Sequence, residues 1–177
     1  VPGGSPEDDR WIPAIFRDLT YKDKQGIAAS CYTSVEFMDK NIGIVLDELK
    51  KLGIEDETLV IYLGDQGYLL GEHKRFEEHT MWAESIKAPL IIQTGSHLKR
   101  GIKIDQLTQF IDVVPSILDL LGLPPMKEAM GKSFLPVLKG KKSEYNDYVF
   151  SEFLEDNKAM VATKDWKYIF TSGKRDL

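Results

Sequence analysis

The polar residues that could do chemistry gather between residues 58 and 85, in the segment TLVIYLGDQGYLLGEHKRFEEHTMWAES. Asp65 and Gln66 stand between two glycines, directly after an apolar run. Their carboxylate and amide oxygens are ligands of the kind that Ca²⁺ or Mg²⁺ prefers. Two oxygens cannot complete a shell of about six to eight ligands, so a cation would need other donors. On spacing alone, the segment fits either part of a cation site or an ordinary polar turn, which is the commoner structure.

Cationic side chains follow this turn and could bind an anionic group. Lys74 and Arg75 are one candidate pair, although such a dipeptide is more often solvated. His79 is a further candidate for binding substrate. The six-residue spacing of His73 and His79 does not suit the helical histidine pair of a zinc site. The segment therefore favours a cation-and-anion crevice over a zinc centre.

Composition excludes several classes of protein. The 177 residues are 42% hydrophobic and 29% charged, as in an ordinary globular protein. The net charge of −5 argues against a nucleic-acid partner. A single cysteine, Cys31, excludes an internal disulfide and a multi-cysteine zinc site. No apolar run approaches the ~20 residues of a membrane span.

A long helix and two strands are predicted in the first half of the chain. Apolar residues at steps of three and four predict an amphipathic helix from about residue 24 to 52, which Gly53 ends in a left-handed conformation. The short apolar run 58–63 predicts a strand buried on both faces, and 89–94 predicts a second strand.

The second half begins with a helix and ends in short strands. Asp112 can cap a helix that carries Pro115 in its first turn and stops at Gly122. Residues 148–153, 160–163 and 166–171 predict short strands, with an antiparallel arrangement. The whole pattern indicates an α/β layered core followed by a smaller β-rich part. In such sheets binding residues collect past the carboxyl ends of the strands, where Asp65 and Gln66 stand.

Several motifs resemble the sulfatase family of the alkaline-phosphatase superfamily. The likeness runs in order over roughly residues 20–171 and includes a helix that carries Asp39. The similar segments are GDQG (64–67), LGEH (70–73), EHTMWAES (78–85), APLII (88–92), QFIDVVPSILDLLGLPP, GKSFLPVLKG and MVATKDWKYIF.

The resemblance implies a fold and a division of the chain. We expect part of an alkaline-phosphatase-like layered sheet with flanking helices, plus a small C-terminal antiparallel β-rich subdomain. Residues 1–20 would be a linker-like start, 21–140 the C-terminal part of the α/β core, and 141–177 the beginning of the subdomain. The partner of this core would be a missing N-terminal half of the same fold.

The resemblance also implies a mechanism for the parent protein. In family members a cysteine or serine of a Cys/Ser-x-Pro-x-Arg motif is oxidised to formylglycine, whose hydrate attacks the sulfur of a sulfate ester. A divalent cation, Ca²⁺ or Mg²⁺, holds the sulfate oxygens, and Asp65 and Gln66 would be two of its ligands. The expected substrate is a sulfated small molecule or carbohydrate. The family further suggests a periplasmic or secreted protein.

Three departures from the family pattern limit these expectations. The paired aspartates that open the family's N-terminal half, and the histidine-containing segment usual before the helix, are absent from this sequence. The sequence holds no Cys/Ser-x-Pro-x-Arg motif, so the formylglycine residue is not in this chain, which we expect to be inactive alone. Glu78 replaces a lysine that commonly binds sulfate, and Lys74 or Arg75 could supply the missing charge. A phosphoester or phosphonate hydrolase of the same superfamily, or a degenerate non-catalytic module, remain alternatives.

Overall fold

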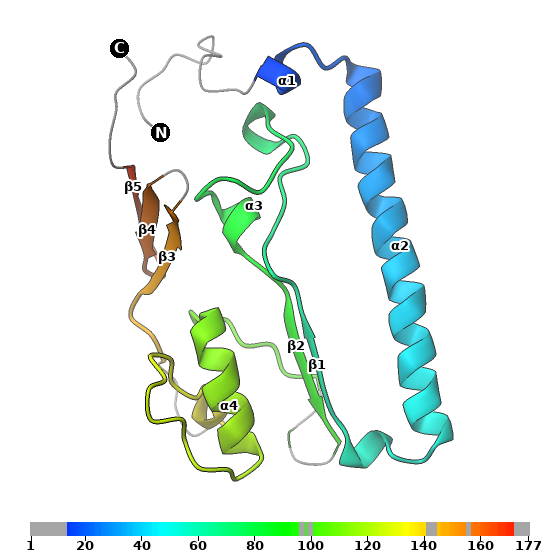
Figure 1. The fold of residues 1–177 in the computed structure, drawn as a ribbon, viewed down its shortest axis with the longest axis vertical. Coiled ribbons are helices and arrows are strands. Elements are labelled where there is room, and N and C mark those ends of the chain that lie inside the picture. Colours follow the sequence, from blue (N-terminus) through cyan, green and yellow to red (C-terminus); the bar gives the residue numbers. More distant parts are fainter. Residues whose placement is uncertain (1–13, 96–97, 99–100, 141–144, 155–156, 172–177) are drawn as a thin grey trace. The chain divides into compact units, whose positions relative to one another are not determined.

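The computed structural model describes residues 14–95, 98, 101–140, 145–154 and 157–171 (Figure 1). The chain forms two compact units, Val1–Ile92 and Gln93–Leu177. Residues 1–13 of the predicted linker-like start lie outside the described residues. The predicted boundaries at residues 20 and 140 stay predictions.

The first unit is built around one long helix. After the short α1 (Ala14–Arg17), α2 spans Tyr21–Lys51 and so begins earlier than the apolar pattern predicted. Its start is fixed by a capping box, in which Asp23 N–H donates to the Thr20 hydroxyl and the Asp23 carboxylate accepts from Thr20 N–H. These polar residues extend the helix beyond its apolar stripe.

The predicted glycine stop of α2 is confirmed. Gly53 has φ 69°, in the left-handed region that glycine adopts without steric cost. Gly53 N–H donates to Lys50 and Ile54 N–H donates to Leu49, which is the pattern of a Schellman cap.

Two strands follow α2 and the 3₁₀ turn η2 (Glu55–Glu57). β1 (Leu59–Leu63) and β2 (Leu90–Thr94) form a two-stranded sheet. Gly64 N–H donates to the Pro89 carbonyl, so the end of β1 lies beside the start of β2, and Figure 1 draws the two strands in opposite directions. β1 was predicted to be buried on both faces, but its residues are half-buried and Leu63 is exposed, because the described residues pair β1 with β2 alone.

The apolar stripe of α2 is only partly covered. Tyr62 on β1 donates its hydroxyl to the sulfur of Met38 across 3.7 Å, which ties the strand to the helix. Val35 and Val45 of the same stripe are nevertheless 49% and 61% exposed. Two short elements complete this unit before β2, η3 (Glu72–Lys74) and α3 (Ala83–Ile86).

The second unit contains two helices and an antiparallel sheet. η4 (Phe110–Asp112) leads into α4 (Val113–Leu120), and α5 (Leu135–Leu138) follows. The sheet order is β3 (Val149–Phe153), β4 (Lys158–Ala162), β5 (Lys167–Thr171), with Met160 paired to Ser151 and Ile169. This arrangement confirms the predicted short antiparallel strands.

Asp112 differs from its predicted role. Its side chain does not cap α4 but is almost fully buried, at 1% exposure. Its carboxylate accepts hydrogen bonds from the backbone N–H groups of Gln109 and Lys132, both at 3.0 Å, and from the Asn146 amide at 3.3 Å. The carboxylate therefore joins three separate segments of the second unit, whereas the sequence pattern suggested a local cap.

Candidate functional site

Asp65 and Gln66 lie on the turn that directly follows β1, as the sequence predicted, and both side chains are exposed. Within the part of the chain that the structure describes, no hydrogen bond or ion pair engages either side chain. Their oxygens are therefore not committed to unrelated partners among these residues. The turn presents one carboxylate and one amide carbonyl together.

The two flanking glycines dock this turn onto the segment before β2. A Cβ atom on Gly67 would overlap the Glu84 carbonyl and lie 2.8 Å from the Lys87 carbonyl oxygen. A Cβ atom on Gly64 would lie 2.8 Å from Cδ of Pro89. Gly67 N–H also donates to the Ser85 carbonyl at 2.8 Å. Only residues without a side chain permit this approach, so the glycines set the position of the turn.

A tightly bonded loop follows the turn and carries its cationic residues. Leu69 is fully buried, and its N–H donates to the Glu77 carbonyl at 3.1 Å. Gly71 N–H donates to the Arg75 carbonyl at 2.9 Å, which closes the loop. His73 and Lys74 both have positive φ, at 52° and 59°, a conformation that non-glycine residues rarely adopt. The fold thus holds these two residues in a strained backbone.

The three predicted substrate-binding residues differ in their surroundings. Arg75 forms an ion pair with Glu77, with side chains only 14% and 22% exposed, and its guanidinium lies 5.9 Å from the centre of the Trp82 ring. Lys74 is exposed. His79 is also exposed, and its Nε2 lies 3.7 Å from a carboxylate oxygen of Glu78. Lys74 and His79 therefore face solvent, whereas Arg75 is held among protein groups.

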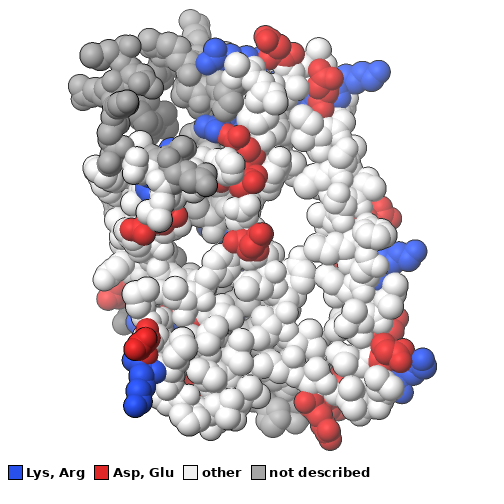
Figure 2. Space-filling view, in the orientation of Figure 1, with Lys and Arg blue, Asp and Glu red and all other residues white. Residues whose placement is uncertain are grey.

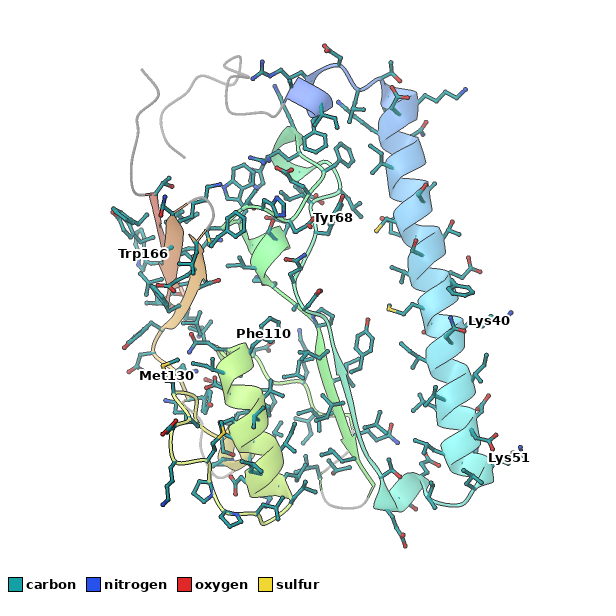
Figure 3. The ribbon with its side chains drawn as sticks, in the orientation of Figure 1. Lys40, Lys51, Tyr68, Phe110, Met130 and Trp166 are labelled. Atoms are coloured by element: carbon teal, nitrogen blue, oxygen red, sulfur yellow. The ribbon has the colours of Figure 1, made fainter. Side chains whose placement is uncertain are left out.

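Glu78 has an imidazole, that of His79, and a phenol, that of Tyr68, as electrostatic neighbours. The neighbouring imidazole of His79 can partly offset its charge when protonated. Burial, and secondarily the Glu78 carboxylate, raise the pKa of the Tyr68 hydroxyl above its ordinary value. That hydroxyl donates to the Phe76 carbonyl at 3.3 Å, and Figure 3 shows Tyr68 on the loop that follows β1. Tyr68 is a neighbour of the site that the sequence did not single out.

The segment before β2 is a second part of the site that sequence reasoning missed. The buried hydroxyls of Thr80 and Ser85 lie 2.6 Å apart, and Trp82 N–H donates to the Thr80 hydroxyl at 3.3 Å. These bonds build a compact support beneath the Asp65–Gln66 turn, through Glu84 and Ser85. No period or charge pattern signals such a support in a single sequence.

The donor set fits part of a divalent-cation site. Asp65 and Gln66 offer hard oxygens from a fixed turn, which suits Ca²⁺ or Mg²⁺ better than zinc. Among the described residues, no group of three or more histidine, cysteine, aspartate or glutamate side chains could hold a metal ion.

On the face that Figure 2 shows, lysine and arginine side chains of the described residues are interspersed with aspartate and glutamate. No helix among the residues placed by the structure is both long and apolar enough to cross a bilayer.

The mixed α/β fold and the oxygen-bearing turn past a strand end define a member of the alkaline-phosphatase-like superfamily. The structure is similar to that of the phosphonate monoester hydrolase of Agrobacterium radiobacter, with a TM-score of 0.78 and 25% identity over 87% of this chain and 34% of that one. The family model named Sulfatase matches residues 5–123. The chain belongs to the sulfatase family.

Two curated relatives support this membership. Arylsulfatase K of Bos taurus is 29% identical over 85% of this chain. An N-acetylglucosamine-6-O-sulfatase of Bacteroides thetaiotaomicron is 36% identical over 59% of it. The matched regions span 30% and 19% of the lengths of these two relatives.

Proposed function

We propose that this chain is the C-terminal part of a sulfuric ester hydrolase, in which Asp65 and Gln66 supply two ligands to a Ca²⁺ or Mg²⁺ ion. The observation that carries the proposal is the glycine-docked turn that presents both side chains, unengaged by other described residues, at the end of β1. Membership of the sulfatase family supports it. The substrate class that fits is a sulfated carbohydrate or small molecule, as the name of the N-acetylglucosamine-6-O-sulfatase relative suggests.

The residues of this chain would bind and orient rather than attack. When bound, the cation would stabilise the negative charge that develops on the sulfuryl oxygens. Asp65 and Gln66 would fix its position, because their backbone is docked against Glu84 and Pro89. Lys74 and His79, which are exposed on the neighbouring loop, would attract the anionic substrate group. The attacking formylglycine would come from the remainder of the parent protein, because the motif is absent here.

A phosphoester or phosphonate hydrolase is the second candidate function. Glu78 leaves this function open, because the lysine that commonly binds sulfate in the family is absent at its position. The structural similarity to a phosphonate monoester hydrolase supports the same alternative. The contact of Glu78 with His79 would weaken the repulsion between this carboxylate and a sulfate ester, since a protonated imidazole would offset the negative charge.

Parallel assays of the full-length protein distinguish these functions. We expect kcat/KM for an aryl sulfate to exceed that for the matching aryl phosphate and phosphonate monoester. Asp65→Ala should lower the sulfatase value by at least about 100-fold, as loss of a key charge-stabilising group does in other enzymes. The isolated 177-residue chain should show no turnover. A preference for the phosphorus esters would favour the second function, and no hydrolysis of any ester would favour a non-catalytic module.

A further inference from the structure

His73 has an unusual backbone and two specific side-chain contacts. Its φ of 52° and ψ of 24° lie in the left-handed region, which costs a non-glycine residue of the order of 1–3 kcal/mol. Its imidazole is stacked on the Trp82 ring, with ring centres 4.1 Å apart and planes inclined by 29°. Its Nε2 lies 3.6 Å from a carboxylate oxygen of Glu84. A strained residue with two defined partners points to a role for its side chain.

Both partners of His73 belong to the segment that supports the Asp65–Gln66 turn. Trp82 directly precedes α3, and Glu84 lies within it. The Glu84 carbonyl is the atom against which Gly67 is packed, and the adjacent Ser85 carbonyl accepts the Gly67 N–H. The side chain of His73 therefore holds the residues whose backbone the turn rests on.

The two contacts differ in strength. A separation of 3.6 Å is too long for a hydrogen bond, and the side chains of His73 and Glu84 are 44% and 37% exposed, so this polar contact is weak. Stacking of the aromatic rings contributes more, because offset stacked rings attract beyond the area they bury. The ring of His73, more than its charge, should then fix Trp82.

We propose that His73 is a positioning residue for the cation ligands Asp65 and Gln66. By stacking on Trp82 and facing Glu84, it links the loop around η3 to α3 and so keeps the backbone beneath the turn in place. This inference rests on the proposed role of Asp65 and Gln66 as ligands. It assigns to His73 no contact with the substrate or the cation.

Calorimetric Ca²⁺ titration of the full-length protein tests this role, with kcat, KM and the melting temperature measured on the same samples. His73→Asn removes the ring but keeps a residue that tolerates the left-handed conformation. It should weaken Ca²⁺ binding by about 10-fold, the low end for loss of a group that orients metal ligands. His73→Phe retains an aromatic ring for Trp82 and should restore most of the affinity. Glu84→Gln removes only the weak polar contact and should bind Ca²⁺ nearly like the wild type. Glu48→Gln, in an exposed ion pair with Lys51 at 3.2 Å on α2, is its matched control and should also bind like the wild type.

The outcomes separate the positioning role from the proposed function. If Asp65→Ala abolishes Ca²⁺ binding while His73→Asn leaves the dissociation constant within twofold of the wild type, the positioning role is overturned and the ligand role stands. If His73→Phe keeps the wild-type melting temperature and still fails to restore affinity, the ring is not the acting group and the inference is again overturned. If Asp65→Ala binds Ca²⁺ like the wild type, both the ligand role and the positioning role fail.

Discussion

At the scale of single residues, Gly67 determines the geometry of the turn more than Asp65 or Gln66 does. Its Cα lies so close to the Glu84 and Lys87 carbonyls that any side chain would collide with backbone atoms. Backbone atoms cannot rotate aside as the end of a flexible side chain can. Packing therefore requires glycine at position 67, whereas the exposed side chains of Asp65 and Gln66 are available to bind a ligand.

Replacing Gly67 by alanine should destabilise the protein and displace the turn. We expect a loss of about 1–3 kcal/mol in the free energy of unfolding, which is typical of overpacking, together with weaker Ca²⁺ binding. Gly43→Ala is the control, because a Cβ atom at Gly43 in α2 meets nothing within 4 Å. That change should stabilise the protein by about 0.5–1 kcal/mol. Urea unfolding measures both, and equal effects of the two substitutions would contradict the packing argument.

Tyr145 gives a prediction for alkaline pH. Burial, followed by the charge of Asp112, raises the pKa of the Tyr145 hydroxyl well above its ordinary value. Below about pH 10, the ordinary tyrosine pKa, the hydroxyl is protonated in both the folded and the unfolded chain. Above that pH the unfolded chain loses the proton first, so the free energy of unfolding falls as pH rises.

Urea unfolding at pH 8 and pH 10.5 measures this effect. Tyr145→Phe should reduce the loss of stability between the two pH values, although it also removes the hydrogen bond from Tyr145 to the Lys132 carbonyl at both. Tyr148→Phe, at an exposed tyrosine, should leave the pH dependence as in the wild type. An unchanged slope in Tyr145→Phe would show that another group causes the alkaline loss.

At the scale of elements, the second unit depends on the buried carboxylate of Asp112. It accepts from backbone groups at Gln109 and Lys132, so η4 and the segment before α5 are joined by one side chain. Gly131 permits this approach, since a Cβ atom there would overlap the Ile111 carbonyl and lie 2.8 Å from Asp112 N. The segments that precede α4 and α5 are therefore connected through polar contacts as well as through the apolar core of this unit.

Asp112→Asn should therefore be costly although it changes few atoms. The amide would have one acceptor oxygen where two carboxylate oxygens now accept, which leaves a buried N–H group without its partner. We expect a loss of about 2–3 kcal/mol in the free energy of unfolding. Asp119→Asn is the matched control on α4, because Asp119 is exposed and, among the residues that the structure describes, accepts only from the Ser133 hydroxyl at 2.6 Å. Equal losses in the two variants would contradict the structural role of Asp112.

At the scale of the whole molecule, the elements were more predictable than their burial. The strands near residues 59 and 90, the glycine stops at Gly53 and Gly122, and the antiparallel strands all follow from local patterns. The prediction that β1 is buried on both faces was wrong for this chain. An apolar run indicates that a strand can pack on both faces, but it does not indicate how many strands surround it.

The candidate site was predictable only in part. Asp65 and Gln66 could be found because a strand end and two glycines mark them in the sequence. The stacking of His73 on Trp82 could not, since it accompanies a left-handed backbone at His73 that histidine does not require. The pairing of Arg75 with Glu77 could not either, since the sequence does not show which charged neighbours meet. The role of Asp112 was missed because its partners lie up to 34 positions away in the chain.

Calorimetric Ca²⁺ titration of the full-length protein with Asp65→Ala, Gln66→Ala and Asp119→Asn tests the central claim most directly. The account predicts that Asp65→Ala abolishes binding, because a charged oxygen ligand is lost. Gln66→Ala should weaken binding, and Asp119→Asn should match the wild type because Asp119 lies on α4, away from the turn in sequence. Wild-type Ca²⁺ affinity in both Asp65→Ala and Gln66→Ala would contradict the account.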